Sequence, residues 1–339
     1  IEKLAEAGIT IDPKDYLDET KLRNNHPALG SAPLYPALLS LYMRVAPFEY
    51  AINRIETFER YQPDLWIAIF NQVLLAVCVM IVFLLARLLF DSAVAWLSAI
   101  LFVGTDLYWK FSSSGNSTIL LLLIFLLLLW SLTKLEGGIS VDAWSNRKTM
   151  LFAALIGVLL SLGFLTRYAF GWLLVPTILF LMFYGGKKKL SLIITVLFVC
   201  FLITTPWLQR NKRVSGTPFG TAGYSVYQLT NPFPGDELQR TLEPDVGNVL
   251  FKDYVRKFRD NGLEIFKQEL PTLGGTWMAG FFLVGLFIMY DDRRRNRIRG
   301  FVLVCLGVFI VVQALGKTQL SIDTPVVNSE NLLVLLGPA

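Results

Sequence analysis

The sequence predicts an all-α polytopic membrane protein, and three observations support this fold class. Of the 339 residues, 54% are hydrophobic and only 17% are charged, whereas soluble globular chains are typically about 25% charged. The mean hydropathy of the chain is +0.53. The hydrophobic residues gather into runs of about 17–25 residues, the length that a helix needs to cross a bilayer. These features exclude a disordered protein, a coiled coil and an ordinary cytosolic enzyme.

Eight apolar runs are candidate membrane spans, and a ninth begins near Asn331 and is cut off. The eight runs cover residues 65–90, 93–108, 117–133, 149–166, 169–184, 190–207, 272–290 and 299–316. Two of them, 93–108 and 169–184, are short, which favours tilted partners in tight hairpins or ends beyond these limits. We therefore expect a bundle of at least eight transmembrane helices.

The lysines and arginines of the short loops predict the orientation of this bundle. Alternate loops contain twelve of these residues in one set and three in the other. The richer set is Arg87, Lys134, Arg147, Lys148, Lys187, Lys188, Lys189, Arg293, Arg294, Arg295, Arg297 and Arg299, and the poorer set is Lys110, Arg167 and Lys317. Because cytoplasmic loops contain the basic excess in membrane proteins, the richer set is predicted to be cytoplasmic.

This orientation divides the chain into four parts. Residues 1–64 are predicted to form a first extracytoplasmic loop with juxtamembrane helices, and residues 65–207 a bundle of six spans. Residues 208–276 form a second extracytoplasmic segment, and residues 277–339 the last spans, the final one cut. Within the second segment, 248–270 places apolar side chains at mostly helical spacing between basic ones. Such a helix lies along the membrane surface, or else it packs on its own domain.

Several common chemistries are excluded by the residues that the chain lacks. There is no P-loop, no GxSxG and no HExxH sequence, and the single histidine excludes a multi-histidine metal site. The three cysteines lie inside apolar runs, so neither a disulfide framework nor a metal site is indicated. The net charge of +5 is accounted for by the cytoplasmic loops, and no nucleic-acid partner is predicted.

Arginines at the outer ends of apolar helices are the main candidate binding residues. Arg167 lies between two spans on the outer side, and Arg210 and Asn211 follow the outer end of another span. A charge at this depth is unfavourable unless it reaches water or has an anionic partner. A guanidinium matches two phosphate oxygens at once, which favours a phosphate-bearing ligand. For Arg167 the alternative is a simple interfacial anchor.

Three further polar residues belong to the same predicted outer pocket. His26 lies in a turn-rich segment, although a lone histidine is more often structural. Asn116 lies at the outer mouth of a hairpin and is also a formal glycosylation site. Glu330 precedes the last apolar run. No cofactor is predicted with certainty. A divalent metal has suitable ligands in the acidic cluster Asp12, Asp15, Asp18 and Glu19, for which a solvated loop is the commoner use.

The order of these features resembles the membrane glycosyltransferases of the GT-C class, in particular the branch with protein mannosyltransferases and aminoarabinose transferases. The segment HPALGSAPLYPALLSLY resembles the first outer loop of that family, and Asn71 resembles its early-helix asparagine. GVLLSLGFLTRYAFGWLLVP resembles a characteristic hairpin of the family, and TPWLQRNKRVSGTPFG resembles the segment that follows a later span. The resemblance covers nearly the whole chain and implies a GT-C-like bundle.

The resemblance also implies an activity. A sugar would be transferred from a polyprenyl-phosphate-linked donor to an unknown acceptor on the outer face, in the bacterial inner membrane. Arg167, Arg210 and His26 would take up the negative charge that develops on the leaving phosphate. The family's catalytic Asp would lie upstream of Ile1, so the chain is expected to be truncated at both ends and its catalytic residue is unknown.

Two departures from the family pattern favour a different function. Asn116 stands where an acidic residue is often found, and no arginine accompanies Glu330. The alternative is therefore a catalytically degenerate GT-C-like subunit with a structural role in a larger membrane complex. A transporter is less consistent with the sequence, because no pair of Gly/Pro-broken helices is visible.

Overall fold

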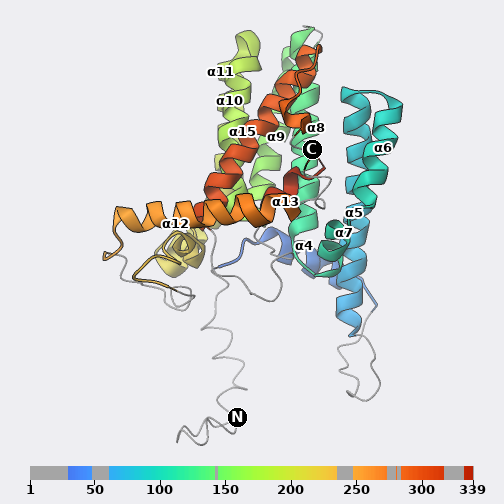
Figure 1. Cartoon of the computed structure of the whole chain (residues 1–339). Coiled ribbons are helices and arrows are strands. Elements are labelled where there is room, and N and C mark those ends of the chain that lie inside the picture. The colour runs from blue at the N-terminus through green and yellow to red at the C-terminus, as the bar shows by residue number, and fades with distance from the viewer. Residues whose placement is uncertain are drawn as a thin grey trace, which may run out of the picture.

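The computed structural model describes residues 30–47, 61–141, 144–234, 247–272, 280, 284–316 and 332–338. Within these ranges the chain forms helices and no β-strand. The long helices run side by side, and one shorter helix lies across one end of the bundle (Figure 1). The predicted fold class, an all-α polytopic membrane protein, is confirmed.

Five helices of the described residues are long and apolar enough to cross a membrane. They are α5 (Gln62–Leu89), α8 (Thr118–Ser140), α9 (Asn146–Thr166), α11 (Lys189–Ser215) and α15 (Arg293–Gly316). Each corresponds to one predicted run. Helix α8 is the central one, because 78% of its most apolar 18-residue window is buried, against 11% for α11. The rest of the chain therefore covers little of the α11 surface.

The two short predicted runs have different explanations. Run 93–108 is a pair of helices, α6 (Ser92–Val103) and α7 (Asp106–Ser113), which meet at a bend of 54° and form either a broken span or a re-entrant loop. Run 169–184 begins as the 3₁₀ helix η2 (Tyr168–Leu173) and continues as α10 (Leu174–Tyr184). In the run predicted at 272–290, residues 273–279 and 281–283 lie outside the described residues.

The apolar residues near the end of the chain are buried in the bundle. Leu332–Leu336 form the 3₁₀ helix η8, and all five side chains are buried. The Tyr108 hydroxyl donates a hydrogen bond of 3.1 Å to the Val334 carbonyl oxygen. The described part of the ninth run is thus a short buried 3₁₀ turn that packs on α8 and α15.

Helix α12 (Phe251–Glu264) lies across the end of the bundle at which α4 (Leu34–Met43) and α7 are found (Figure 1). Its buried residues are polar: Asp253, Lys257 and Asn261. Its exposed apolar side chains include Phe251, Val255 and Phe258. Because the polar stripe packs on the protein, the apolar stripe is left for the membrane surface, which favours the first of the two interpretations of segment 248–270.

A buried ion cluster joins α8 to α15 at the opposite end of the bundle. The Glu136 side chain is 2% exposed, and its Oε1 lies 2.6 Å from Nη1 of Arg297. Its Oε2 lies 3.6 Å from Nε of Arg294, and the Ser140 hydroxyl donates to Oε1 at 2.6 Å. Helix α8 ends at Ser140, seven residues beyond the end predicted at 133. The helix can continue past Lys134 because each charged side chain on this last stretch has a partner or reaches the surface.

Candidate substrate-binding site

The end of the bundle that the sequence predicts to be the outer one is formed where α9 ends and turns sharply into η2. The backbone N–H of Arg167 bonds to the Gly163 carbonyl oxygen at 2.9 Å, and the Phe170 N–H bonds to the Arg167 carbonyl oxygen at 2.9 Å. Arg167 itself is extended, with φ −155° and ψ 121°. A Cβ atom on Gly163 would lie 2.1 Å from the Phe170 ring. Only glycine at position 163 allows this ring to close the turn and hold Arg167 at the helix end.

The Arg167 side chain points toward the start of α8. Its Nη2 donates to the Ser117 hydroxyl at 3.5 Å. Ser117 is the N-cap residue of α8, and its side chain makes no capping hydrogen bond. The first N–H groups of a helix and the positive end of its dipole favour an anion. Arg167 and the α8 N-terminus therefore place two positive features beside each other at the mouth of the bundle.

Asn116 lies next to this pair. It is half-buried, and its amide donates to the Ser114 hydroxyl at 3.0 Å. Gly115, with φ +72°, precedes it and turns the chain from α7 into α8. Asn116 directly precedes Ser117, whose hydroxyl Arg167 contacts, and its place in the same site stays a prediction.

A second group of side chains links the turn at Arg167 to α11. The Tyr168 hydroxyl accepts hydrogen bonds from Trp207 Nε1 at 2.8 Å and from Asn211 Nδ2 at 3.1 Å. Asn211 is fully buried. It also donates to the Pro218 carbonyl oxygen at 3.2 Å. Because three elements meet at this hydroxyl and amide, Tyr168 and Asn211 fix the position of the turn relative to the end of α11.

Arg210 is held by the same group. Its Nη1 donates to Oδ1 of Asn211 at 3.0 Å, and its guanidinium lies 4.8 Å from the centre of the Trp207 ring. A guanidinium stacked on an aromatic ring is a stable arrangement. Arg167 and Arg210 are thus connected through their neighbours Tyr168 and Asn211, while a shared cavity for both guanidiniums stays a prediction.

Asn71 has a structural explanation. It is fully buried in α5, and its Nδ2 donates to the Tyr35 hydroxyl at 3.0 Å. That hydroxyl donates in turn to the Gly115 carbonyl oxygen at 2.9 Å. The chain of bonds fastens α4 and α5 to the loop that precedes α8. Tyr35 and Tyr168 were not singled out from the sequence, although the PLY and TRY sequences that contain them belong to the quoted motifs.

Two predicted site residues, His26 and Glu330, lie outside the described residues, and so does the acidic cluster between Asp12 and Glu19. No group of three or more His, Cys, Asp or Glu side chains suited to a metal ion occurs within the described part of the chain. A divalent metal therefore stays a prediction.

Comparison with known proteins identifies the fold. Residues 61–209 match the family model described as dolichyl-phosphate-mannose-protein mannosyltransferase. Two solved structures are similar to the chain, each at 14% identity over 91% of its length. One is the archaeal oligosaccharyltransferase AglB from Archaeoglobus fulgidus in complex with an inhibitory peptide and a dolichol-phosphate, with a TM-score of 0.51. The other is the Archaeoglobus fulgidus oligosaccharyltransferase in complex with Zn and sulfate, with a TM-score of 0.52.

These similarities concern the fold. The chain spans 42% and 40% of the length of the two solved proteins. No curated protein matches the chain. The family model and both structures describe sugar transferases, and the predicted resemblance to the GT-C class is confirmed.

Proposed function

We propose that this GT-C fold belongs to a membrane glycosyltransferase that transfers a sugar from a polyprenyl-phosphate-linked donor to an acceptor on the extracytoplasmic face. The supporting observation is the position of Arg167, whose guanidinium lies against the uncapped N-terminus of α8. In such a reaction the bond between the anomeric carbon and the phosphate oxygen breaks, and negative charge grows on the phosphate. Fixed positive groups at that point lower the barrier.

The other residues of the mouth have positioning roles in this proposal. Tyr168 and Asn211 hold the Arg167 turn against α11, and Arg210 is a second cation for the phosphate. The acceptor hydroxyl loses a proton as the new glycosidic bond forms, which requires a carboxylate base. We propose that this base is an Asp at the outer end of a span that precedes Ile1.

Replacing Arg167 by alanine is expected to lower the rate of sugar transfer about 10²–10³-fold, the usual effect of removing one donor that stabilises a developing anion. The measurement uses the full-length protein in proteoliposomes with a polyprenyl-phosphate mannose as the first donor tested. Lys212→Ala is the matched control, because Lys212 is an exposed cation on the same end of the bundle. An unchanged rate in Arg167→Ala, or an equal loss in Lys212→Ala, would contradict the proposal.

The alternative function is a degenerate structural subunit, and the amide of Asn116 in place of a carboxylate favours it. The sugar-transfer assay in proteoliposomes distinguishes the enzyme from the structural subunit. Full-length protein that binds the donor lipid but transfers no sugar, with any polyprenyl-linked donor, would favour the structural subunit.

The extracytoplasmic position of the site is tested by cysteine labelling in intact cells. A thiol reagent that cannot cross membranes is expected to label Lys212→Cys at once, and to label Lys187→Cys only after the membrane is permeabilised. The reason is the predominance of basic residues in the loops on the Lys187 side. Labelling of position 187 from outside would reverse the topology and place the candidate site in the cytoplasm.

A further inference from the structure

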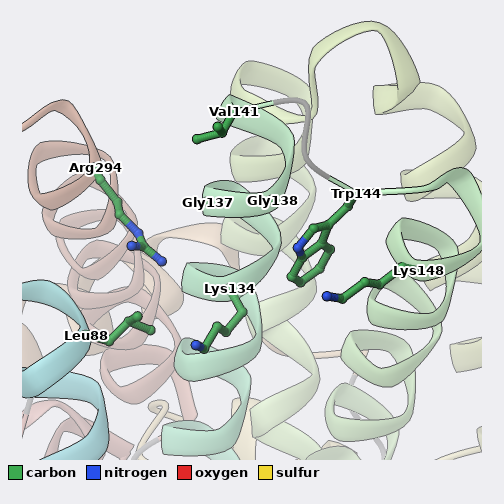
Figure 2. Close-up of a pocket in the computed structure, with 8 residues that line it drawn as sticks. All are labelled: Leu88, Lys134, Gly137, Gly138, Val141, Trp144, Lys148 and Arg294. Atoms are coloured by element: carbon green, nitrogen blue, oxygen red, sulfur yellow. The ribbon is translucent and has the colours of Figure 1, made fainter.

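A shallow cavity of about 420 Å³ lies at the opposite end of the bundle from the candidate substrate site. It is bordered by α8, by Leu88 of α5, by Arg294 of α15, and by Trp144 and Lys148 at the start of α9. Figure 2 shows the side chains of Lys134, Lys148 and Arg294 around the last turns of α8. The predicted orientation places this end on the cytoplasmic side.

The cavity has an excess of positive charge. Lys148 Nζ lies 4.3 Å from the centre of the Trp144 ring, and Lys134 Nζ lies 5.7 Å from that of Trp130. Neither ammonium group makes an ion pair with any described residue. Arg294 shares the single carboxylate of Glu136 with Arg297. Among the described residues, Glu136 is the only carboxylate that pairs with any of these three cations, so an anion in the cavity would meet positive charge that this one carboxylate does not balance.

Two glycines make room for this arrangement. A Cβ atom on Gly138 would lie 2.3 Å from the Trp144 ring, and a Cβ atom on Gly137 would lie 2.8 Å from Nη2 of Arg294. The indole and the guanidinium consequently lie directly on the backbone of α8. Leu88 and Val141 add apolar surface to the same cavity. A site with cations, an interfacial tryptophan and an apolar wall matches a lipid headgroup and the start of its acyl chain.

We propose that this cavity binds an anionic phospholipid of the cytoplasmic leaflet, with its phosphate between Lys134, Lys148 and Arg294. A lipid fits better than free phosphate for two reasons. The cavity lies at the end of membrane-spanning helices, and much of its lining is apolar. The inner leaflet of biological membranes is also rich in anionic lipids, which basic pockets between helices recognise. This inference does not depend on the proposed glycosyltransferase activity.

The test compares the binding of phosphatidylglycerol with that of phosphatidylcholine. Native mass spectrometry measures how much of each lipid stays bound to the purified full-length protein. The double variant Lys134→Gln/Lys148→Gln is expected to bind phosphatidylglycerol less tightly, by about fivefold for each lysine removed. Lys187→Gln/Lys188→Gln is the matched control, since it removes the same charge from the same end of the bundle but outside the cavity. It is expected to bind as the unchanged protein does.

Three results would overturn the proposal. The first is equal retention of phosphatidylcholine and phosphatidylglycerol by the unchanged protein. The second is an equal loss in the two double variants, which would indicate general surface charge. The third is displacement of the lipid by millimolar inorganic phosphate, which would indicate a free-anion site.

Should the glutamine variant fold poorly, Lys134→Arg/Lys148→Arg preserves the charge and is expected to retain phosphatidylglycerol. Loss of binding in that folded variant would also contradict the proposal.

Discussion

Replacing Glu136 by glutamine is expected to reduce the free energy of unfolding by about 2–3 kcal/mol. The carboxylate is 2% exposed and lies between two arginines whose side chains are 27% and 30% exposed. Breaking a fully buried ion pair costs about 3–5 kcal/mol, because an unpaired charge stays in a poorly solvated place. We expect a loss at or just below the lower limit of that range, since both arginines can turn part of their charge toward water. The loss is measured as a lower midpoint of unfolding in detergent.

The matched control for Glu136→Gln is Asp106→Asn. Asp106 pairs with Lys110 at 2.6 Å, the same distance that separates Glu136 from Arg297. The Asp106 and Lys110 side chains are 75% and 50% exposed, and exposed pairs usually contribute about 0–1 kcal/mol. The two substitutions remove one charge each with little change of shape. Equal effects would show that burial of the Glu136 cluster contributes nothing to stability.

The long spans were predictable because the length and hydropathy of an apolar run are local properties. The end of α8 was not, because the run was ended at Lys134, the first charged residue. Its continuation to Ser140 depends on Arg297, which is 161 positions away from Glu136 in the chain. A sequence read locally gives no sign of which distant cation will neutralise a given carboxylate.

The face of α12 that packs on the protein could also not be chosen from the sequence. The spacing of its apolar and basic residues indicated an amphipathic helix, but either the apolar or the polar face could have packed on the protein. The structure buries Lys257, which donates to the carbonyl oxygens of Ser225 at 2.7 Å and Val226 at 3.2 Å. Burial lowers the pKa of Lys257 to about 8. A lysine turned inward in this way contradicts the usual pattern of soluble helices. It is the pattern expected of a helix whose apolar face lies on a membrane surface.

The candidate site was predicted through its charged residues, whereas its supporting residues were missed. Arg167 stood out because a cation at a helix end is unusual in an apolar chain. Tyr168 and Trp207 did not, because aromatic residues in apolar runs resemble ordinary core residues. Their role becomes visible only when α9 and α11 are side by side and one hydroxyl accepts two hydrogen bonds. The roles of His26 and Glu330 remain predictions.

Replacing Gly163 by alanine is expected to disturb the turn that holds Arg167. The added methyl group would lie 2.1 Å from a ring atom of Phe170, and that ring is fully buried. Because the ring cannot move away without opening a cavity, the turn must shift or the helix must bend. Overpacking of this kind costs about 1–3 kcal/mol. We expect a lower unfolding midpoint together with weaker binding of the donor lipid, since Arg167 is displaced from Ser117.

Gly307→Ala in α15 is the matched control, because an alanine methyl there has no neighbour within 4 Å. Alanine favours a helix over glycine by up to about 1 kcal/mol, so this variant is expected to be as stable as the unchanged protein or slightly more so. Adding Phe170→Leu to Gly163→Ala removes the ring atoms that clash. The double variant is therefore expected to lose less stability than the sum of the two single changes. Additive losses, or a Gly163→Ala protein with unchanged stability and donor binding, would show that the contact between Gly163 and Phe170 does not position Arg167.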